Sequence, residues 1–290
     1  IYSLPSEDHP NPPTVSESTN ILVSESGLIP ALLKSRSAQA TDTAKSILTG
    51  TVLVRDSGER ISIAATDGYT LFVDELPVIN NSDWDEMILS PKLVGFMSEF
   101  KAYNQVSISR DHDFIRVDLQ TGEAIYSKLV CGKYPAFRKI LPKQFNHTLT
   151  VNRKELLDLA IEAKPFVNKQ TKIISFQINH ADITATVDQV TTEIDQAATD
   201  ARHAKYSSYR RDKVAVYKTN TIYTNRIDCQ LINPVTTPEK ISFNREYLES
   251  VLKTFDCETI TICMNSEIQP VIISKNKYDE RQTMIMPIKP

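Results

Sequence analysis

The sequence predicts an α+β fold in which a unit of one helix and several antiparallel strands is repeated along the chain. Four segments share one order, a short apolar strand, then a serine or asparagine, then an amphipathic helix. They begin at Asn20, Glu86, His147 and Lys240. Between them, apolar and polar residues alternate, which is the pattern of strands with one buried face. We therefore expect helices packed on one face of antiparallel sheets.

Capping chemistry supports the strand-to-helix junctions. Ser90 precedes Pro91, a favourable first helical residue because its missing N–H would have no partner there. Asn152 stands three positions before Glu155, which is a variant of the capping box. Asn244 can accept hydrogen bonds from first-turn N–H groups in the same way. Each of these residues predicts the start of a helix.

The remaining segments predict strands and turns. Residues 61–78 have the pattern of two strands joined by a turn at Asp67 and Gly68. Residues 106–130 follow the same alternation, and the chain ends in a further apolar meander after residue 259. Each helix is therefore expected to be followed by several antiparallel strands.

The spacing of the repeats predicts two domains. The junction residues Ser24, Ser90, Asn152 and Asn244 are separated by 66, 62 and 92 residues. With two units in each domain, the domains cover 18–136 and 137–290, and 1–17 form a linker or the end of a preceding domain. The excess length in the third unit is expected as an insertion near 196–240. Its first half is rich in Arg and Lys, so it is either a solvated surface loop or a basic arm that contacts DNA.

Composition excludes several classes of function. Hydrophobic residues make up 41% and charged residues 24%, which is typical of globular domains, and the net charge is −3. Any contact with nucleic acid must therefore come from a local basic stripe. With 7 glycines and neither GxGxxG nor GxxxxGK[ST], no nucleotide cofactor is expected. No apolar run is long enough to span a membrane.

The cysteines and the first residues of the chain indicate the cellular compartment of the protein. The 4 cysteines contain no CxxC pair, which predicts free thiols in a reducing cytoplasm and no metal site. The first residues, IYSLPSEDHP, lack both a methionine and the pattern of a signal peptide. We therefore expect a cytoplasmic protein whose numbering begins inside a longer chain or after processing.

No catalytic constellation is apparent. The 5 histidines never occur at HxH or HExxH spacing, and no serine has a GxSxG context. Asp111, His112 and Asp113 could form a metal or acid–base cluster, but they lie between two alternating segments. An exposed hairpin turn is the favoured interpretation. The chain is therefore expected not to be an enzyme.

Several motifs, in order along nearly the whole chain, resemble those of one family. AATDGYTL (residues 64–71) resembles the ATDGHRL of bacterial sliding clamps, the β subunit of DNA polymerase III. SKLVCGKYPAFRKILPKQFNHTLTVNRKELLDLA (residues 127–160) is similar to the family's run through the linker between its second and third domains. FNREYLESVLKTF (residues 243–255) and the ending MIMPIKP resemble the family's FNxxYLxDVL and VMPMRL.

The resemblance implies the DNA-clamp fold and a role as a non-catalytic processivity factor in DNA replication. The two domains would be the family's second and third, without the first. Clamp protomers assemble head to tail into a ring, a homodimer when the first domain is present. Their helices line the hole around duplex DNA, which is contacted without regard to base sequence. DNA polymerase III, the clamp loader and repair proteins dock through short apolar motifs, and no membrane is involved.

The resemblance also implies site residues. The partner-peptide pocket would be formed by Leu48, Thr66, Gly68, Tyr69, Thr70, Leu71, Pro135, Lys139, Ile140, Asn244, Tyr247, Ile268, Pro270, Met284, Ile285, Met286, Pro287 and Ile288. Candidates facing DNA are Lys34, Arg36, Lys92, Lys101, Arg153, Lys154, Arg245 and Lys253. Candidates for the ring interface are Pro165, Phe166 and Val167.

The chain departs from the family at two places in the pocket. Tyr69 and Thr70 replace the family's His–Arg, and Lys289 and Pro290 replace its terminal Arg–Leu. The preferred partner motif could therefore differ from that of other clamps. Two alternatives stay open, a clamp-derived paralogue that binds partners without supporting processive synthesis, and an unrelated hydrolase that would use residues 111–113.

Overall fold

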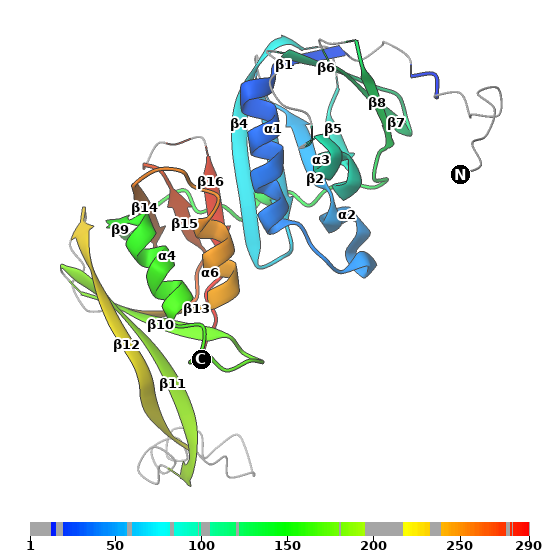
Figure 1. Cartoon of the computed structure of the whole chain (residues 1–290). Helices are drawn as coiled ribbons and strands as arrows, with labels where there is room; N and C mark the ends of the chain where they lie inside the picture. Colours follow the sequence, from blue (N-terminus) through cyan, green and yellow to red (C-terminus); the bar gives the residue numbers. More distant parts are fainter. Residues whose placement is uncertain are drawn as a thin grey trace, which may run out of the picture. The chain divides into compact units, whose positions relative to one another are not determined.

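The chain folds into two compact units, each with its own apolar core (Figure 1). Unit 1 comprises Ile1–Leu141 with Tyr278–Met284, and unit 2 comprises Pro142–Lys277 with Ile285–Pro290. The sequence predicts a boundary at 136/137, whereas the units divide at 141/142. Residues 278–284, near the end of the chain, belong to unit 1 as well. This computed structural model describes residues 13–15, 20–56, 60–81, 84–97, 99, 105–119, 122–179, 181–194, 217–232, 239–276, 279 and 281–289.

Unit 1 contains eight described strands with helices packed against them. In chain order its elements are β1 (Asn20–Ser24), α1 (Glu25–Ser35), η2 (Arg36–Ala38), η3 (Thr43–Lys45), α2 (Ser46–Thr49), β2 (Thr51–Arg55), β3 (Arg60–Thr66), β4 (Thr70–Asn81), β5 (Glu86–Leu89), α3 (Pro91–Met97), β6 (Gln105–Arg110), β7 (Phe114–Leu119), β8 (Ala124–Lys128) and η4 (Phe137–Lys139).

The long strand β4 organises unit 1. Its first part, from Leu71 to Pro77, pairs antiparallel with β3, whereas its last part, from Val78 to Asn81, pairs with β1. It thereby connects the β5–β2–β3 ladder to the β1–β6–β7–β8 ladder. Helix α1 packs on β3 and β4, and it also contacts α3. Leu28, Leu32 and Ile63 are fully buried in the resulting core.

Unit 2 repeats this plan. In chain order its elements are β9 (His147–Asn152), α4 (Arg153–Glu162), β10 (Ile173–Ile178), β11 (Asp182–Ile194), β12 (Tyr217–Leu231), β13 (Glu239–Asn244), α6 (Arg245–Leu252), β14 (Thr259–Met264) and β15 (Val271–Ser274), and β16 (Gln282–Ile285) begins in unit 1 and ends here.

Strand β12 takes the role in unit 2 that β4 has in unit 1. It pairs with β11 over most of its length and with β9 at its end, where Cys229 lies opposite Val151. The two ladders are therefore β13–β10–β11–β12 and β12–β9–β14–β15. Helices α4 and α6 pack side by side and close the apolar core.

The four predicted junctions are confirmed as β1–α1, β5–α3, β9–α4 and β13–α6. The Oγ of Ser90 accepts from the N–H of Leu93 at 3.2 Å. The Oδ1 of Asn152 accepts from the N–H of Glu155 at 3.1 Å, and the Oδ1 of Asn244 accepts from a first-turn N–H at 2.9 Å. Because these caps satisfy N–H groups that have no helical partner, each helix begins where the sequence predicts.

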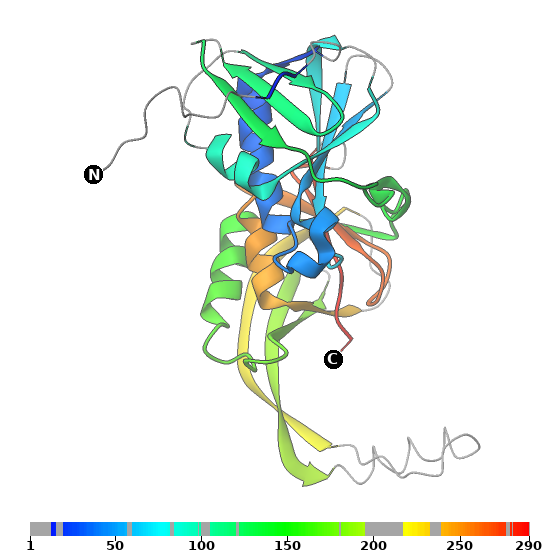
Figure 2. The same ribbon diagram turned by 90° about the vertical axis from the view of Figure 1, so that its right-hand side faces the viewer.

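The expected insertion near 196–240 lies only partly within the described residues. Residues 182–194 and 217–231 form one long antiparallel hairpin, in which Asp182 lies opposite Asp228 and Ile194 lies opposite Tyr217 (Figures 1 and 2). Residues 217–231, which lie inside the expected insertion, are therefore strand, and β-branched and aromatic residues recur in both arms of the hairpin. The basic residues predicted for this region, except Lys218, fall within 195–216, outside the described residues.

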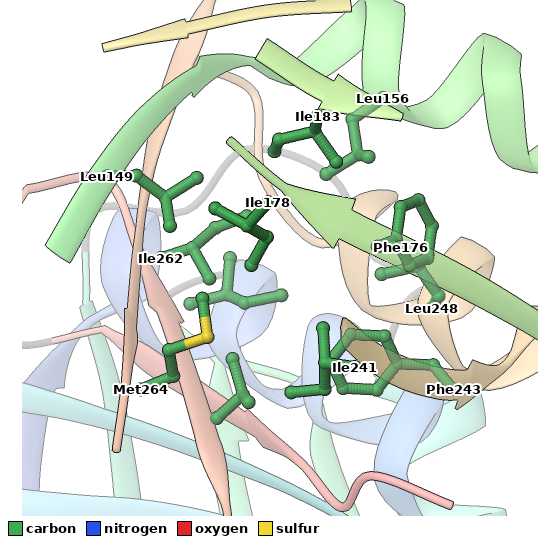
Figure 3. Close-up of a pocket in the computed structure, with 12 residues that line it drawn as sticks. Leu149, Leu156, Phe176, Ile178, Ile183, Ile241, Phe243, Leu248, Ile262 and Met264 are labelled. Carbon is green, nitrogen blue, oxygen red and sulfur yellow. The ribbon is translucent and has the colours of Figure 1, made fainter. Parts of the chain in front are cut away.

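The core of unit 2 encloses a small apolar cavity (Figure 3). Its volume is about 30 Å³, and its lining includes Leu149, Phe176, Ile241 and Met264. A space of this size corresponds to a single water, which would find no polar partner here. Its apolar lining offers no polar group that could orient a ligand. None of the described helices is long and apolar enough to cross a membrane.

Candidate functional site

The β3–β4 turn of unit 1 is held in one conformation by side-chain hydrogen bonds. The Oδ1 of Asp67 accepts from the N–H of Tyr69 at 2.8 Å and from the N–H of Thr70 at 2.7 Å. The Oγ1 of Thr66 donates to the carbonyl of Thr70 at 2.6 Å and accepts from the N–H of Gly68 at 3.1 Å. Gly68 adopts φ +96°, which other residues rarely adopt. The turn therefore presents the Tyr69 ring, which is 55% exposed, from a preorganised backbone.

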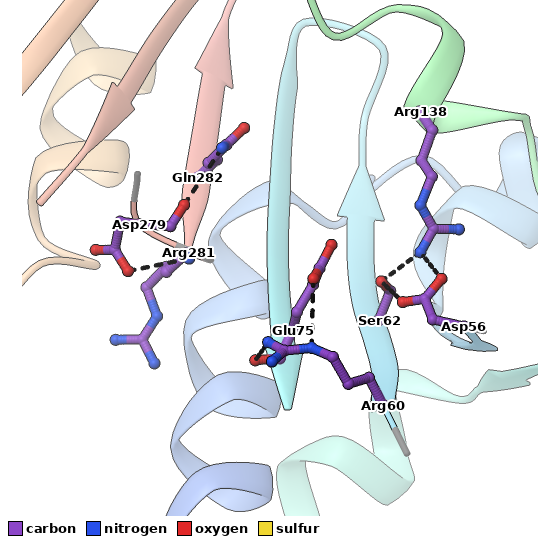
Figure 4. A network of polar contacts seen from close by, with 8 residues as sticks. All are labelled: Asp56, Arg60, Ser62, Glu75, Arg138, Asp279, Arg281 and Gln282. Carbon is purple, nitrogen blue, oxygen red and sulfur yellow. Dashed lines mark hydrogen bonds and ion pairs between the residues drawn. The ribbon is translucent and has the colours of Figure 1, made fainter. Parts of the chain in front are cut away.

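The segment after β8 is attached to the same unit by an aromatic residue and a charged residue. Phe137 of η4 is buried, and the Arg138 guanidinium lies over the Phe137 ring. Arg138 also donates to the carboxylate of Asp56 and to the Oγ of Ser62 (Figure 4). Around these anchors the candidates Pro135, Lys139 and Ile140 are exposed, and Leu48 is half-buried.

Unit 2 contributes its candidates from α6, from the residues before β15, and from the end of the chain. Ile268 is 61% exposed, whereas Tyr247 and Pro270 are half-buried. Met286, Pro287 and Ile288 are half-buried as well, and the N–H of Ile288 donates to the carbonyl of Ser242 on β13 at 2.7 Å. The last residues therefore lie along the edge of the sheet.

Some pocket candidates are core residues. Leu71 and Ile285 have no exposed surface, and Thr66, Thr70 and Met284 are also buried. The sequence left open whether Leu71, Tyr247 and Ile285 are core or pocket, and the structure makes Leu71 and Ile285 core. These buried residues can support a docking surface from behind, while the exposed and half-buried candidates are available for contact.

A buried ion pair attaches residues 279–284 to unit 1. The Nη2 of Arg281 lies 2.6 Å from the Oδ2 of Asp74, which is 3% exposed, and the Nε donates to the same oxygen at 2.7 Å. Burial raises the pKa of Asp74 although Arg281 acts in the opposite direction. The contact therefore holds the segment that leads into Met284.

This arrangement predicts a pH effect on stability. A raised carboxyl pKa means that the folded state binds the proton more tightly than the unfolded state, so Asp74 costs stability as pH rises above its ordinary value of 3.8. The free energy of unfolding of wild type, relative to that of Asp74→Asn, should fall as pH rises from about 3 to about 7. Urea unfolding of both proteins across this range checks the sign, and a relative rise would contradict it.

The candidates facing DNA differ in exposure. Arg36, Lys92 and Lys154 are exposed, and Lys34 is half-buried. Lys253 is exposed but its Nζ lies 2.6 Å from the Oε1 of Glu249. Lys101 lies outside the described residues.

Two further candidates carry structural contacts. The Nε of Arg153, which is half-buried, donates to the carbonyl of Cys257 at 2.8 Å. Arg245 is contradicted as a residue facing DNA, because its side chain is only 3% exposed. It makes an ion pair with Glu249, one helical turn further along α6. The start of α6 thus directs this guanidinium inward, where Glu249 neutralises its charge.

The ring-interface candidates follow α4 in unit 2. Phe166 is 42% exposed, and its ring stacks on that of Tyr223 with centroids 5.2 Å apart. Val167 packs against the core of unit 2, and Pro165 is exposed. Of the three, Phe166 and Pro165 therefore offer surface for a contact with another chain.

The hairpin turn predicted at residues 111–113 is confirmed. The Oδ1 of Asp111 accepts from the N–H groups of Asp113 and Phe114, and the His112 side chain is 96% exposed. Within the described part of the chain, no group of three or more His, Cys, Asp or Glu residues is arranged to hold a metal ion. The four cysteines are free thiols.

Each unit therefore contains two strand–helix repeats, and each carries some of the candidate pocket residues. A family model described as "DNA polymerase III beta subunit, C-terminal domain" matches residues 219–289. The β sliding clamp of Synechocystis sp. is 24% identical over 100% of this chain and 70% of its own length. That of Streptococcus pneumoniae is 23% identical over 98% of this chain and 68% of its own length.

Solved structures agree in fold. The crystal structure of the DNA polymerase III subunit β from Pseudomonas aeruginosa superposes with a TM-score of 0.80 at 20% identity, covering 99% of this chain and 70% of that one. The sliding clamp of Bartonella birtlesii gives 0.77 at 20% identity, over 99% and 70%. The chain has the fold of these clamp structures, is similar to bacterial β sliding clamps along its whole length, and spans about 70% of these relatives. The comparisons favour neither of the two alternative functions.

Proposed function

We propose that this chain acts as a DNA polymerase processivity factor, as part of a ring that encircles duplex DNA and docks partners through short apolar motifs. The observation that carries the proposal is the ordered match to β sliding clamps along the whole chain. A ring needs no contacts to base edges, because topological linkage replaces sequence-specific affinity. Such a protein is a tether and not a catalyst.

The described helices fit weak, sequence-independent contact with DNA. Arg36 and Lys92 are exposed in unit 1, and Lys154 is exposed in unit 2. Close to Lys154, α4 also exposes Glu155 and Asp158, which reduces the attraction of this helix for phosphates. Attraction that is local, weak and sensitive to salt is compatible with sliding.

The proposed docking surface has two properties that partner recognition requires. The β3–β4 turn is preorganised, so little entropy is lost when a peptide binds beside it. Exposed or half-buried apolar side chains at the proposed pocket positions include Tyr69, Ile140, Ile268 and Met286. Methionine is an adaptable contact for several partners. In this proposal, Phe166 and Pro165 contribute to the joint between protomers.

The tethering function is tested on closed and linear DNA. The protein is loaded on a nicked circular plasmid with a clamp loader and ATP, washed at high salt, and the plasmid is then cut or left closed. We expect retention on the circle and loss after cutting, because only a topological link survives the salt that screens phosphate contacts. Equal loss from both DNAs would reject the ring and favour the partner-binding paralogue.

A further inference from the structure

Tyr134, which is not among the predicted pocket residues, lies between the two segments of unit 1 that carry pocket candidates. It immediately precedes Pro135, and its side chain is 3% exposed. Its hydroxyl oxygen accepts from the N–H of Thr66 at 3.0 Å. Thr66 is the first residue of the turn that presents Tyr69. One side chain therefore joins the turn to the segment that leads into η4.

Tyr134 is itself fixed from its other end. Its backbone N–H donates to the Oε1 of Glu86 at 3.2 Å, and Glu86 begins β5. The residue thus spans from β5 to the end of β3, with a hydrogen bond at each end. Burial raises the pKa of Tyr134 to about 12, so its hydroxyl keeps its proton at physiological pH.

The bond to Thr66 completes the hydrogen bonding of the turn. Within the turn, the side chain of Thr66 accepts a hydrogen bond from the N–H of Gly68. The side chain of Asp67 accepts from the N–H groups of Tyr69 and Thr70. The N–H of Thr66 instead takes its acceptor from Tyr134, which is 68 residues away in sequence. The internal hydrogen bonds make the turn rigid but do not fix its position relative to other segments. The hydrogen bond between Thr66 and Tyr134 fixes the position of the turn relative to Pro135.

From this geometry we propose that Tyr134 is a positioning residue for partner docking, holding the Thr66–Leu71 turn and the Pro135–Ile140 segment in register. This inference rests on the proposed docking function. Tyr134 is buried and therefore acts through the residues on either side of it. Without its hydroxyl, both segments keep their internal bonds and lose their fixed relation, so a peptide has to order them when it binds.

The test compares Tyr134→Phe with wild type in calorimetric titrations with a short clamp-binding peptide that carries the apolar tail of a replicative polymerase. Phenylalanine keeps the ring and removes only the acceptor of the Thr66 N–H. We expect affinity to fall about threefold to tenfold, the equivalent of one hydrogen bond. Tyr126→Phe is the matched control, since Tyr126 lies on β8 outside both segments, and its affinity should equal that of wild type.

Amide hydrogen exchange separates positioning from general destabilisation. In Tyr134→Phe, exchange should accelerate at Thr66 and Tyr69 and stay unchanged in the β6–β7 ladder. Should this variant fold poorly, Glu86→Ala releases the backbone of Tyr134 instead and should lower affinity in the same direction.

The outcomes distinguish the inference from the function on which it rests. Unchanged peptide affinity in Tyr134→Phe, with a wild type that binds, overturns the positioning role and leaves partner docking intact. No binding by the wild type itself counts against docking. Exchange that accelerates throughout unit 1 would show a structural role only and would also overturn the proposal.

Discussion

Replacing Met286 and Tyr247 together by alanine is expected to abolish binding of a short apolar clamp-binding peptide that wild type binds at micromolar concentration. Both side chains belong to unit 2, and both are half-buried, so each has surface for a ligand and packing that holds it in place. A methionine and an aromatic ring are the kinds of side chain that dominate docking of apolar motifs. Loss of both should weaken affinity at least about 100-fold.

The measurement is a calorimetric or anisotropy titration of wild type, the double variant and a control. Ile222→Ala is the control, because it removes an exposed apolar side chain (41%) from β12, which carries none of the proposed pocket residues. Tyr247 also packs against the core of unit 2, so the unfolding midpoint of each protein must be recorded. Retained affinity in a folded double variant would remove these residues from the docking surface.

Glu249→Gln should lower the free energy of unfolding by about 3 kcal/mol, although glutamine has the same shape as glutamate. Glu249 accepts from Arg245, the first residue of α6, and from Lys253, the C-cap residue of the same helix. Arg245 is 3% exposed, and its other carboxylate partner, Glu246, is 50% exposed and lies 3.7 Å away, so loss of the Glu249 charge leaves the buried guanidinium with only this weaker partner. Such a buried charge is costly because the core cannot replace the water that solvated it.

The control for this prediction is Glu75→Gln. Glu75 is 38% exposed and pairs at 3.6 Å with Arg60, which is 35% exposed, so loss of this charge should cost less than about 1 kcal/mol. Urea unfolding of the three proteins checks both values. A loss of similar size in the two variants would show that the burial of Arg245 does not decide the effect.

The pH dependence of the Glu249 effect has a definite sign. The hydrogen bond from Lys253, and then that from Arg245, hold the pKa of Glu249 below its ordinary value of 4.5. The stabilisation is therefore fully present above that pH and is lost as pH falls through the lower folded pKa. The difference between wild type and Glu249→Gln should shrink in this acidic window.

Local chemistry was sufficient to predict the repeated fold. The apolar strand, the capping Ser or Asn and the amphipathic helix follow one another within about twenty residues, and each satisfies its own hydrogen bonds. Ser90, Asn152 and Asn244 therefore marked three helix starts from the sequence alone. The turn at Asp67 and Gly68 was equally visible, because it depends on a side chain and a positive φ within four residues.

Side-chain direction could not be predicted in the same way. Arg245 follows a helix cap, and a charged residue at such a position is usually exposed to solvent. Its side chain is nevertheless buried, because Glu249 lies one helical turn away and neutralises the guanidinium charge. Leu71 and Ile285 could be assigned to the core only from the structure, in which neither side chain has exposed surface. The pairing of β11 with β12 could not be predicted, because it joins residues that lie on either side of positions 195–216 in the sequence.

The sequence by itself determined the repeat, the number of strand–helix units and the resemblance to β sliding clamps, because these depend on patterns between near neighbours. Only the tertiary structure decided which candidates are exposed, that Arg281 pairs with Asp74, and that Tyr134 holds the turn at Thr66. Those contacts join residues 207 and 68 positions apart. Nothing local specifies such pairs, since they form only when packed sheets bring distant segments within hydrogen-bonding distance.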